Sequence, residues 1–391
     1  MTSVQEAISI IESKSNRLSI QKVDLIEALG YSLAENIVSQ IDMPPFNQSA
    51  MDGYAVAMHE SSDYKLMGVI KAGDKSSFEL SPGECVRIFT GAVVPNGANC
   101  VAKQEIVIVL NDSEIRVEEV LLDLGNIRPK GEQIEIGDIG LPKGTFLNTG
   151  AIGFAAILGV KSLNVFRKPK ITIIATGSEL IKPGQTLTEG EIYESNTFTL
   201  QAALKTSNFD AEIQTVEDDY EITKSKIKNA IALKDVVIIT GGISVGDYDF
   251  VGTALSELKV TTGFYKIKQK PGKPMFFGYQ GEKLIFALPG NPASALSCYY
   301  NYVLPALNLL SGKTNAHLEK RTLTLQSNYK KTVKMTHFLK GYAQDENVQI
   351  LEKQSSAMLN SFVSGNCLIM LEEGRENWSI GDKVQSILIP Q

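Results

Sequence analysis

Four lysines stand within eight positions of the sequence, in the stretch YKIKQKPGKPMFFG at residues 265–278. Lys266, Lys268 and Lys270 share the parity that places side chains on one face of a β-strand, and Lys273 follows in a Pro-Gly-Lys-Pro turn. A Lys-rich strand also protects a sheet edge against aggregation, and these residues alone favour that interpretation. A site for small anions is the alternative, which the neighbouring motifs must support.

Polar glycine turns follow three other short apolar segments, ITIIAT, DVVIIT and KLIFAL. Together with the lysine stretch they supply the candidate binding residues Gly177, Ser178, Glu179, Gly241, Gly242, Ser244, Gly246, Asp247, Asp249, Lys268, Lys270, Pro271, Gly272, Lys273, Pro289, Gly290, Asn291, Pro292 and Ser294. Glycine turns and helix N-termini present free backbone N–H groups that bind phosphate-like anions, and lysines add charge. Together, the four turns favour an anion site over ordinary loops.

Carboxylates in these turns predict a metal ion as well. Glu179, Asp247 and Asp249 would repel an anion unless a hard cation lies between them, and Mg²⁺ is the expected ion. Zinc is not expected, because the four cysteines and three histidines are scattered without ligand spacing. The P-loop is excluded too, since the SGKT at 311–314 follows a helical segment and has Leu307 where the first glycine belongs.

The elements that must position these turns alternate between strand and helix over residues 168–315. Such alternation predicts a doubly wound α/β sheet, in which ligands bind beyond the carboxyl ends of the strands. The turns should therefore lie along one edge of one sheet.

Three further regions flank this domain. Residues 43–139 alternate as short strands and predict a β-rich module, while residues 1–42 and 140–167 show helical patterns and predict an elongated helical region. Residues 316–391 return to short strands, which favours a small C-terminal β-barrel or sandwich. The fold class expected is multidomain α/β plus β.

Composition narrows the partners and the location. A formal net charge of −6 over 391 residues argues against a protein that coats nucleic acid or anionic membrane. The first residues form no signal peptide, no apolar run is long enough to span a bilayer, and the cysteines show no disulfide framework. We expect a cytoplasmic protein.

Six ordered motifs add a resemblance over essentially the full chain. The segments NQSAMDGYAV, RIFTGAVVPNGAN, TGSEL, TGGISVGDYDF, KPGKP and LPGNPASAL together resemble the molybdopterin molybdenumtransferase family, the MoeA type that includes the E domain of gephyrin. The resemblance implies a four-part elongated subunit that forms a homodimer. It also implies an Mg²⁺-assisted enzyme that takes adenylylated molybdopterin, inserts molybdate at the dithiolene and releases AMP.

Carried over by position, the resemblance implies catalytic roles for Asp52, Thr90, Glu179 and Asp249, and metal binding by Glu179, Asp247 and Asp249. Asp52 and Thr90 belong to the β-rich module, so we expect a site shared between two subunits, although Asp52 also fits a local turn cap. Gln133 stands where the family has aspartate, so we expect no metal-ligand or charge role at this position.

Two rival functions remain. An adenylyltransferase of the same pathway would resemble residues 168–315 alone, and the additional modules argue against it. A scaffold protein, the second role of the gephyrin E domain, would need an appended partner-binding region, and we expect none here. Other enzymes of molybdenum cofactor synthesis are possible partners.

Overall fold

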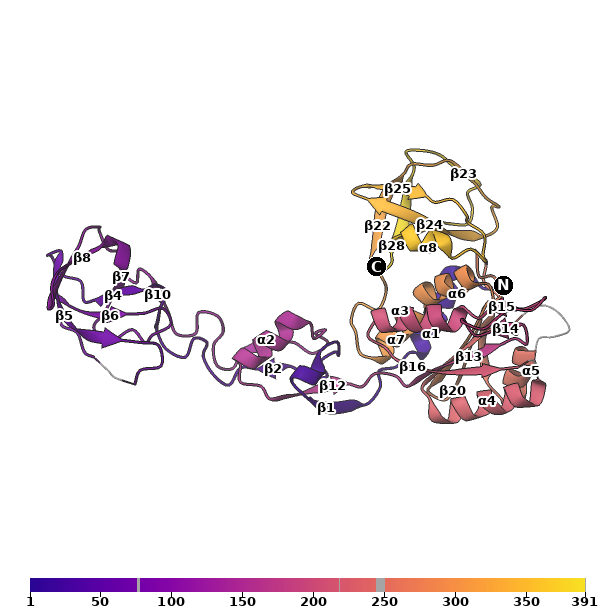
Figure 1. Ribbon diagram of the computed structural model, residues 1–391, viewed down its shortest axis with the longest axis horizontal. Coiled ribbons are helices and arrows are strands. Elements are labelled where there is room, and N and C mark those ends of the chain that lie inside the picture. Colours follow the sequence, from indigo (N-terminus) through magenta and orange to yellow (C-terminus); the bar gives the residue numbers. More distant parts are fainter. Residues whose placement is uncertain (76–77, 218, 244–249, 391) are drawn as a thin grey trace.

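The computed structural model describes residues 1–75, 78–217, 219–243 and 250–390. Figure 1 shows an elongated molecule with a β-rich module at one end and a small middle segment. An α/β domain lies at the other end, and a C-terminal β-barrel stands beside it. This fold class, α/β combined with β, is the one that the sequence predicted.

A six-stranded mixed sheet forms the centre of the α/β domain, in the order β16-β13-β17-β21-β20-β18. Its strands are β13 (Ile171–Thr176), β16 (Ala211–Val216), β17 (Val236–Thr240), β18 (Thr261–Tyr265), β20 (Phe276–Gln280) and β21 (Lys283–Leu288). β16, β13, β17 and β21 are parallel, so their carboxyl ends meet at one edge. β20 runs antiparallel to both β18 and β21, so β18 ends and β20 begins at that edge.

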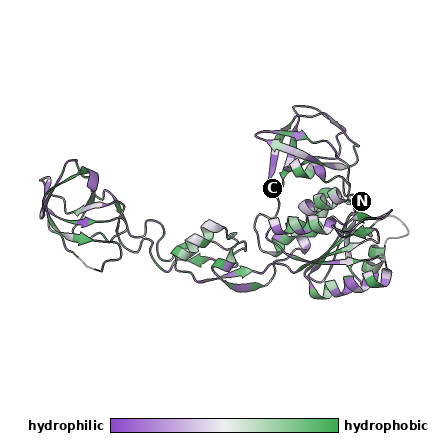
Figure 2. Ribbon diagram, viewed as in Figure 1, coloured by the Kyte–Doolittle hydropathy of each residue, from purple (hydrophilic) through white to green (hydrophobic). Residues whose placement is uncertain are grey.

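Helices cover both faces of this sheet, as a doubly wound fold requires. The residues that pack on one face come from α1 (Val4–Lys14), α3 (Asn196–Thr206), α6 (Pro292–Cys298), a π-helical turn (Tyr299–Val303) and α7 (Leu304–Leu310). α4 (Tyr220–Leu233) and α5 (Phe250–Glu257) supply the other face. Figure 2 shows hydrophobic residues along the strands, whereas α4 carries both hydrophilic and hydrophobic residues because one side meets solvent.

The C-terminal barrel closes because β24 pairs with both β25 and β26. Its strands are β22 (Lys320–Leu325), β24 (Thr336–Gln344), β25 (Asn347–Ile350), β26 (Cys367–Leu371) and β28 (Lys383–Leu388). The short pair β23 (Tyr329–Lys330) and β27 (Asn377–Trp378) and the helix α8 (Asn360–Ser364) lie around it. β19 (Gln269–Lys270), a segment of the α/β domain, pairs in parallel with β24 and so fixes the barrel to the sheet edge.

The β-rich module contains its own six-stranded sheet, in the order β7-β4-β6-β5-β9-β8. The strands are β4 (Gly53–Val56), β5 (Asp63–Ile70), β6 (Glu84–Ile88), β7 (Cys100–Lys103), β8 (Val107–Asn111) and β9 (Glu114–Val117), with the short pair β3 (Gln48–Ser49) and β10 (Ile127–Arg128) beside them. Buried side chains such as Val86, Ile88 and Val101 form its core.

The middle segment corrects the expectation of a helical region over residues 1–42. Two antiparallel pairs build most of it: β1 (Ile20–Asp24) with β12 (Ser162–Phe166), and β2 (Ile37–Val38) with β11 (Ile139–Leu141). α2 (Thr149–Ile157) packs against them. α1 instead packs on the α/β domain, where Ala7 and Ile11 are buried, because its apolar stripe fits that larger core.

The described residues contain neither a membrane-spanning helix nor a disulfide bond. No helix in that part of the chain is long and apolar enough to cross a membrane. Its four cysteines are all free and buried, and burial raises the pKa of the Cys85, Cys298 and Cys367 thiols to about 12.

Candidate functional site

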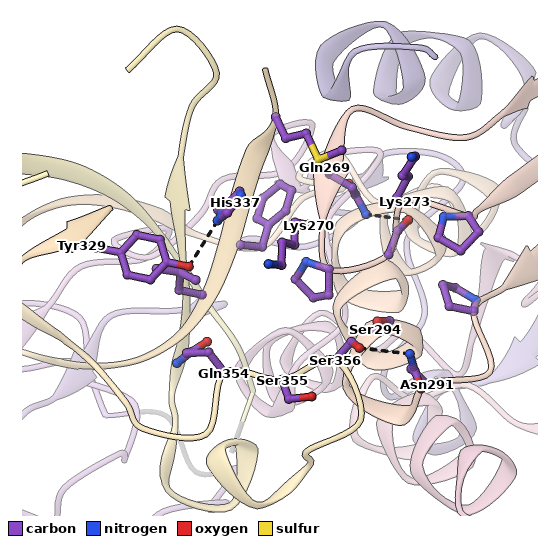
Figure 3. A pocket seen from close by; sticks show the side chains of 17 residues that line it. Gln269, Lys270, Lys273, Asn291, Ser294, Tyr329, His337, Gln354, Ser355 and Ser356 are labelled. Carbon is purple, nitrogen blue, oxygen red and sulfur yellow. Dashed lines mark hydrogen bonds between the residues drawn. The ribbon is translucent and has the colours of Figure 1, made fainter. Parts of the chain in front are cut away.

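A cavity of about 550 Å³ lies where the α/β domain meets the barrel (Figure 3). The α/β domain lines it with Gln269, Lys270, Pro271, Gly272, Lys273, Pro274, Pro289, Asn291 and Ser294. The barrel region adds Tyr329, Met335, His337, Phe338, Leu339, Gln354, Ser355 and Ser356. This set, which we call the junction cavity, contains two lysines and no carboxylate, so its charge suits an anion.

The Pro-Gly-Lys-Pro turn forms one wall of the junction cavity and rests on a buried polar network. Gln269 is fully buried, accepts a hydrogen bond from Tyr302, and donates to the Gly272 carbonyl at 3.3 Å. Gly272 has a φ of +86°, and an added Cβ would lie 2.5 Å from the Cys298 sulfur. Only glycine therefore fits this position, and the network holds Lys270 and Lys273 at the cavity.

The opposite wall comes from the barrel loop 353–358, which the candidate residues did not include. Asn291 donates to the Ser356 hydroxyl at 3.0 Å, and the Ser294 amide donates to the Ser356 carbonyl at 3.2 Å. Lys340, which is only 3% exposed, donates to the carbonyls of residues 353, 355 and 358 and so shapes this loop. The lone lysine in the apolar strand HFLKGYA was the available signal for such a role.

A second cavity of about 390 Å³ opens at the carboxyl edge of the parallel strands. Thr176, Glu179, Leu180, Ile192, Glu194, Asn196, Thr240, Gly241, Ile243, Pro274, Pro289, Gly290 and Asn291 line it. We call it the edge cavity. It shares Pro274, Pro289 and Asn291 with the junction cavity, so these three residues separate two neighbouring binding spaces.

Close backbone contact and one amide fasten the turns of the edge cavity. A Cβ on Gly241, whose φ is +87°, would lie 2.4 Å from the Thr176 carbonyl oxygen, so the two turns approach as only glycine allows. Asn196 donates to the Thr240 hydroxyl and to the Gly290 carbonyl, both at 2.8 Å. Asn196, the first residue of α3, thus ties two strand ends together, although the turn motifs gave no sign of it.

The described carboxylates of the edge cavity are Glu179 and Glu194. Thr197 donates to both oxygens of the buried Glu194, through its amide and its hydroxyl. Glu179 comes from the turn after β13, as expected. Within the described ranges, no group of three or more metal-binding side chains gathers. Ser244, Gly246, Asp247 and Asp249 lie outside the described residues.

Asp52 and Thr90 meet in the β-rich module. The Asp52 carboxylate accepts hydrogen bonds from the backbone amide and the hydroxyl of Thr90, both at 2.8 Å, and these bonds hold its pKa below the usual value. The turn that Asp52 caps is therefore a distant one and not its own. In Figure 1 this module lies at the far end of the subunit from the α/β domain and the barrel, whose residues line the two cavities.

Lys266, Lys268 and Lys270, which we call the lysine row, do not share one face of a β-strand as their alternation predicted. β18 ends at Tyr265, and Lys266 adopts a φ of +70°, which breaks the alternation before the next lysine. Lys270 and Lys273 line the junction cavity, whereas Lys268 lines neither cavity. Of the remaining candidates, Gly177, Ser178 and Gly242 lie in the turns at the sheet edge, and Pro292 begins α6.

Comparisons with known proteins cover nearly the whole chain. Family models match as "MoeA N-terminal region (domain I and II)" at residues 2–159, "Probable molybdopterin binding domain" at 172–309 and "MoeA C-terminal region (domain IV)" at 322–389. A protein of Haemophilus influenzae named molybdopterin molybdenumtransferase is 34% identical over 93% of this chain and 92% of its own length. One of the same name from Staphylococcus epidermidis is 31% identical over 99% and 95%.

Solved structures agree with these sequence matches. A crystal structure of a molybdopterin biosynthesis MoeA protein from Pyrococcus horikoshii superposes with a TM-score of 0.84, at 29% identity, and covers 99% of this chain and all of that one. The fold, the order of the modules and the sequence therefore agree from end to end, and the chain belongs to the MoeA family of molybdopterin molybdenumtransferases.

Proposed function

We propose that this protein acts in molybdenum cofactor biosynthesis as a molybdopterin molybdenumtransferase. It takes adenylylated molybdopterin and molybdate, and joins the molybdenum to the two dithiolene sulfurs while one molybdate oxygen leaves with the two thiol protons as water. A water molecule then cleaves the phosphoanhydride that links AMP to the pterin phosphate. The observation that carries the proposal is the pair of adjoining cavities. One offers Lys270 and Lys273 with no carboxylate among the described residues that line it, and the other offers glycine turns beside Glu179.

The two cavities support a division of labour. The junction cavity suits the compact oxyanions, because Lys270, Lys273 and the hydroxyl of Ser294 supply charge and hydrogen bonds. The edge cavity suits the pterin and nucleotide portions, since glycine turns let backbone amides approach phosphate oxygens closely. Asn291, which belongs to both, would lie between the reacting parts.

Magnesium remains part of the proposal. Glu179 is a hard oxygen donor in the edge cavity, which fits Mg²⁺, and Asp247 and Asp249 are its proposed companions. The ion would neutralise charge on the phosphate oxygens. Glu194 is a poorer ligand, because Thr197 already occupies both of its oxygens.

A homodimer with shared sites is the proposed assembly. The elongated subunit separates Asp52 and Thr90 from its own cavities, and a twofold arrangement can bring them to the cavities of the partner (Figure 1). Large apolar side chains in and near the middle segment support an interface there, since Ile20, Ile26, Leu29, Ile136 and Ile139 are each more than half exposed. We propose the cytoplasm as its location, because its four cysteines are free.

One assay tests the activity. Purified protein is incubated with adenylylated molybdopterin and Mg²⁺, with and without molybdate, and AMP is followed by chromatography. The proposal expects AMP release that depends on molybdate. Consumption of ATP without release of AMP from the adenylylated pterin would instead support the adenylyltransferase of the same pathway.

A second experiment tests the shared site. Chains carrying Asp52→Ala and chains carrying Asp249→Ala are mixed, and heterodimers are confirmed by native mass spectrometry. A shared site restores one intact centre per heterodimer, so two inactive parents should regain measurable activity. Heterodimers that stay inactive would leave Asp52 with its hydrogen bonds to Thr90 alone.

A further inference from the structure

One buried side chain of the junction cavity is not explained by its protein contacts. His337 lies on β24, is only 3% exposed and lines the cavity. Its Nδ1 lies 3.3 Å from the Tyr329 hydroxyl, whereas its Nε2 is buried and has no hydrogen-bond partner among the described residues. A buried polar atom without a partner is costly, so a partner supplied from outside the chain is the natural explanation.

Positive charge surrounds His337. The parallel register of β19 and β24 places it opposite Lys270, and Lys331, itself buried, donates to the Met335 carbonyl at 2.8 Å nearby. Figure 3 shows His337 between Tyr329 and Lys270 at the cavity wall. The neighbour on the adjacent strand β26 is the apolar Leu371, which brings no charge.

The charges that act on the imidazole therefore have one sign. Burial first, and then the charges of Lys331 and Lys270, lower the pKa of His337 to about 4. Glu373 acts on Lys331, but the described residues place no carboxylate against the imidazole. The Tyr329 phenol stays protonated, because burial raises its pKa, and it can donate to Nδ1 or accept from it.

We propose that His337 determines the charge of the anion that the junction cavity accepts, by taking up one proton when a doubly charged oxyanion binds beside Lys270. The inference rests on the proposed function, which assigns oxyanions to this cavity. A dianion offsets the charges of Lys270 and Lys331 that keep the imidazole neutral, so the protonated imidazole becomes favourable and can donate from both ring nitrogens. A singly charged anion leaves part of this positive charge uncompensated, so the imidazole stays neutral.

The proposal fixes the direction of a pH effect. The pKa of His337 is low in the anion-free protein and higher in the complex, so protons favour binding between these two values. Within that pH window the dissociation constant of the doubly charged anion should increase about tenfold for each unit by which the pH is raised, which is the limit for one coupled proton.

Sulfate is the probe, because it keeps its double charge while histidine titrates, between about pH 5 and 8. Calorimetry of the intact protein in two buffers of different ionisation enthalpy gives the protons taken up per sulfate. We expect close to one proton with sulfate and much less with perchlorate, which has the same tetrahedral shape and a single charge. His337→Gln, which keeps a nitrogen donor but does not titrate, should bind sulfate without proton uptake and with an affinity independent of pH.

Wild-type protein provides a second measurement, for the case that the variant does not fold. The chain has three histidines, so NMR of histidine-labelled protein can follow each imidazole with and without sulfate. The pKa of His337 should rise on binding, whereas the imidazole resonances of His59 and His317 should keep their positions when sulfate is added. Sulfate binding without proton uptake, or equal uptake in the folded His337→Gln variant, would overturn the role of His337 and leave the oxyanion site intact. If neither sulfate nor molybdate bound, the oxyanion assignment itself would fail, and the inference with it.

Discussion

The lysines of the Pro-Gly-Lys-Pro region offer the sharpest test of the site, because three of them stand close in sequence but differ in placement. Lys270 and Lys273 are exposed at the junction cavity, and the described residues form no ion pair with either. Lys268 is half-buried outside both cavities, and its charge acts on Glu6 of α1. Alanine at each position therefore compares cavity lysines with a matched lysine of the same segment.

The expected loss of anion affinity in each variant follows from the solvent exposure of the substituted lysine. A hydrogen bond to a charged group is worth about 1.5 to 3 kcal/mol, or about 10- to 150-fold in affinity. Both cavity lysines reach solvent, so screening places each loss near the lower end, at about tenfold. Lys268→Ala should change the affinity by less than about twofold. Stability should change little, by about 0.5 kcal/mol or less, as is usual for exposed side chains without partners.

Equilibrium binding of molybdate and of AMP to each variant, with urea unfolding as the control, supplies the data. We expect Lys270→Ala and Lys273→Ala to bind molybdate about tenfold more weakly at unchanged stability. Molybdate affinity that is equal in all three variants, or weakened most by Lys268→Ala, would refute the assignment of the junction cavity. The alternative interpretation, that these lysines protect a sheet edge against aggregation, would then be favoured.

Three further predictions concern the scaffold. Lys340→Met removes the donor from three loop carbonyls, so the free energy of unfolding in urea should fall by about 3 kcal/mol and molybdate should bind more weakly. The variant Lys340→Arg should restore part of both the stability and the affinity. Gly272→Ala should destabilise by about 1 to 3 kcal/mol, because its Cβ would meet the Cys298 sulfur, and unchanged unfolding would contradict the geometry. Burial raises the pKa of Asp235, but hydrogen bonds from Arg167 and a backbone amide outweigh it and hold the pKa below its usual value, so this stabilisation is present above about pH 4 and is lost as pH falls further. Arg167→Met should therefore cost about 3 to 5 kcal/mol at pH 7 and much less near pH 3, measured by urea unfolding at both pH values.

The sequence by itself determined the fold class and most local elements of the α/β domain. Ser3 and Glu6 form the capping box that begins α1, with the Glu6 amide donating to Ser3 at 3.2 Å, and the apolar runs ITIIAT, DVVIIT and KLIFAL became parallel neighbours. These features depend on contacts between residues close in the chain and on a burial pattern with a regular period, which are both legible in a one-dimensional pattern. The family resemblance followed from the ordered motifs in the same way.

Only the tertiary structure decided which residues face the ligand spaces. Alternation could not show that Lys266 turns to a positive φ and that Lys268 points elsewhere, since the partner of this segment is β24, more than sixty positions away. His337 and Ser356 reach the junction cavity, and Lys340 shapes the loop that carries Ser356, because the barrel closes on itself and docks at the sheet edge. Such placements depend on packing between distant segments, and a residue's burial, partners and pKa are properties of that packing and not of its neighbours in sequence.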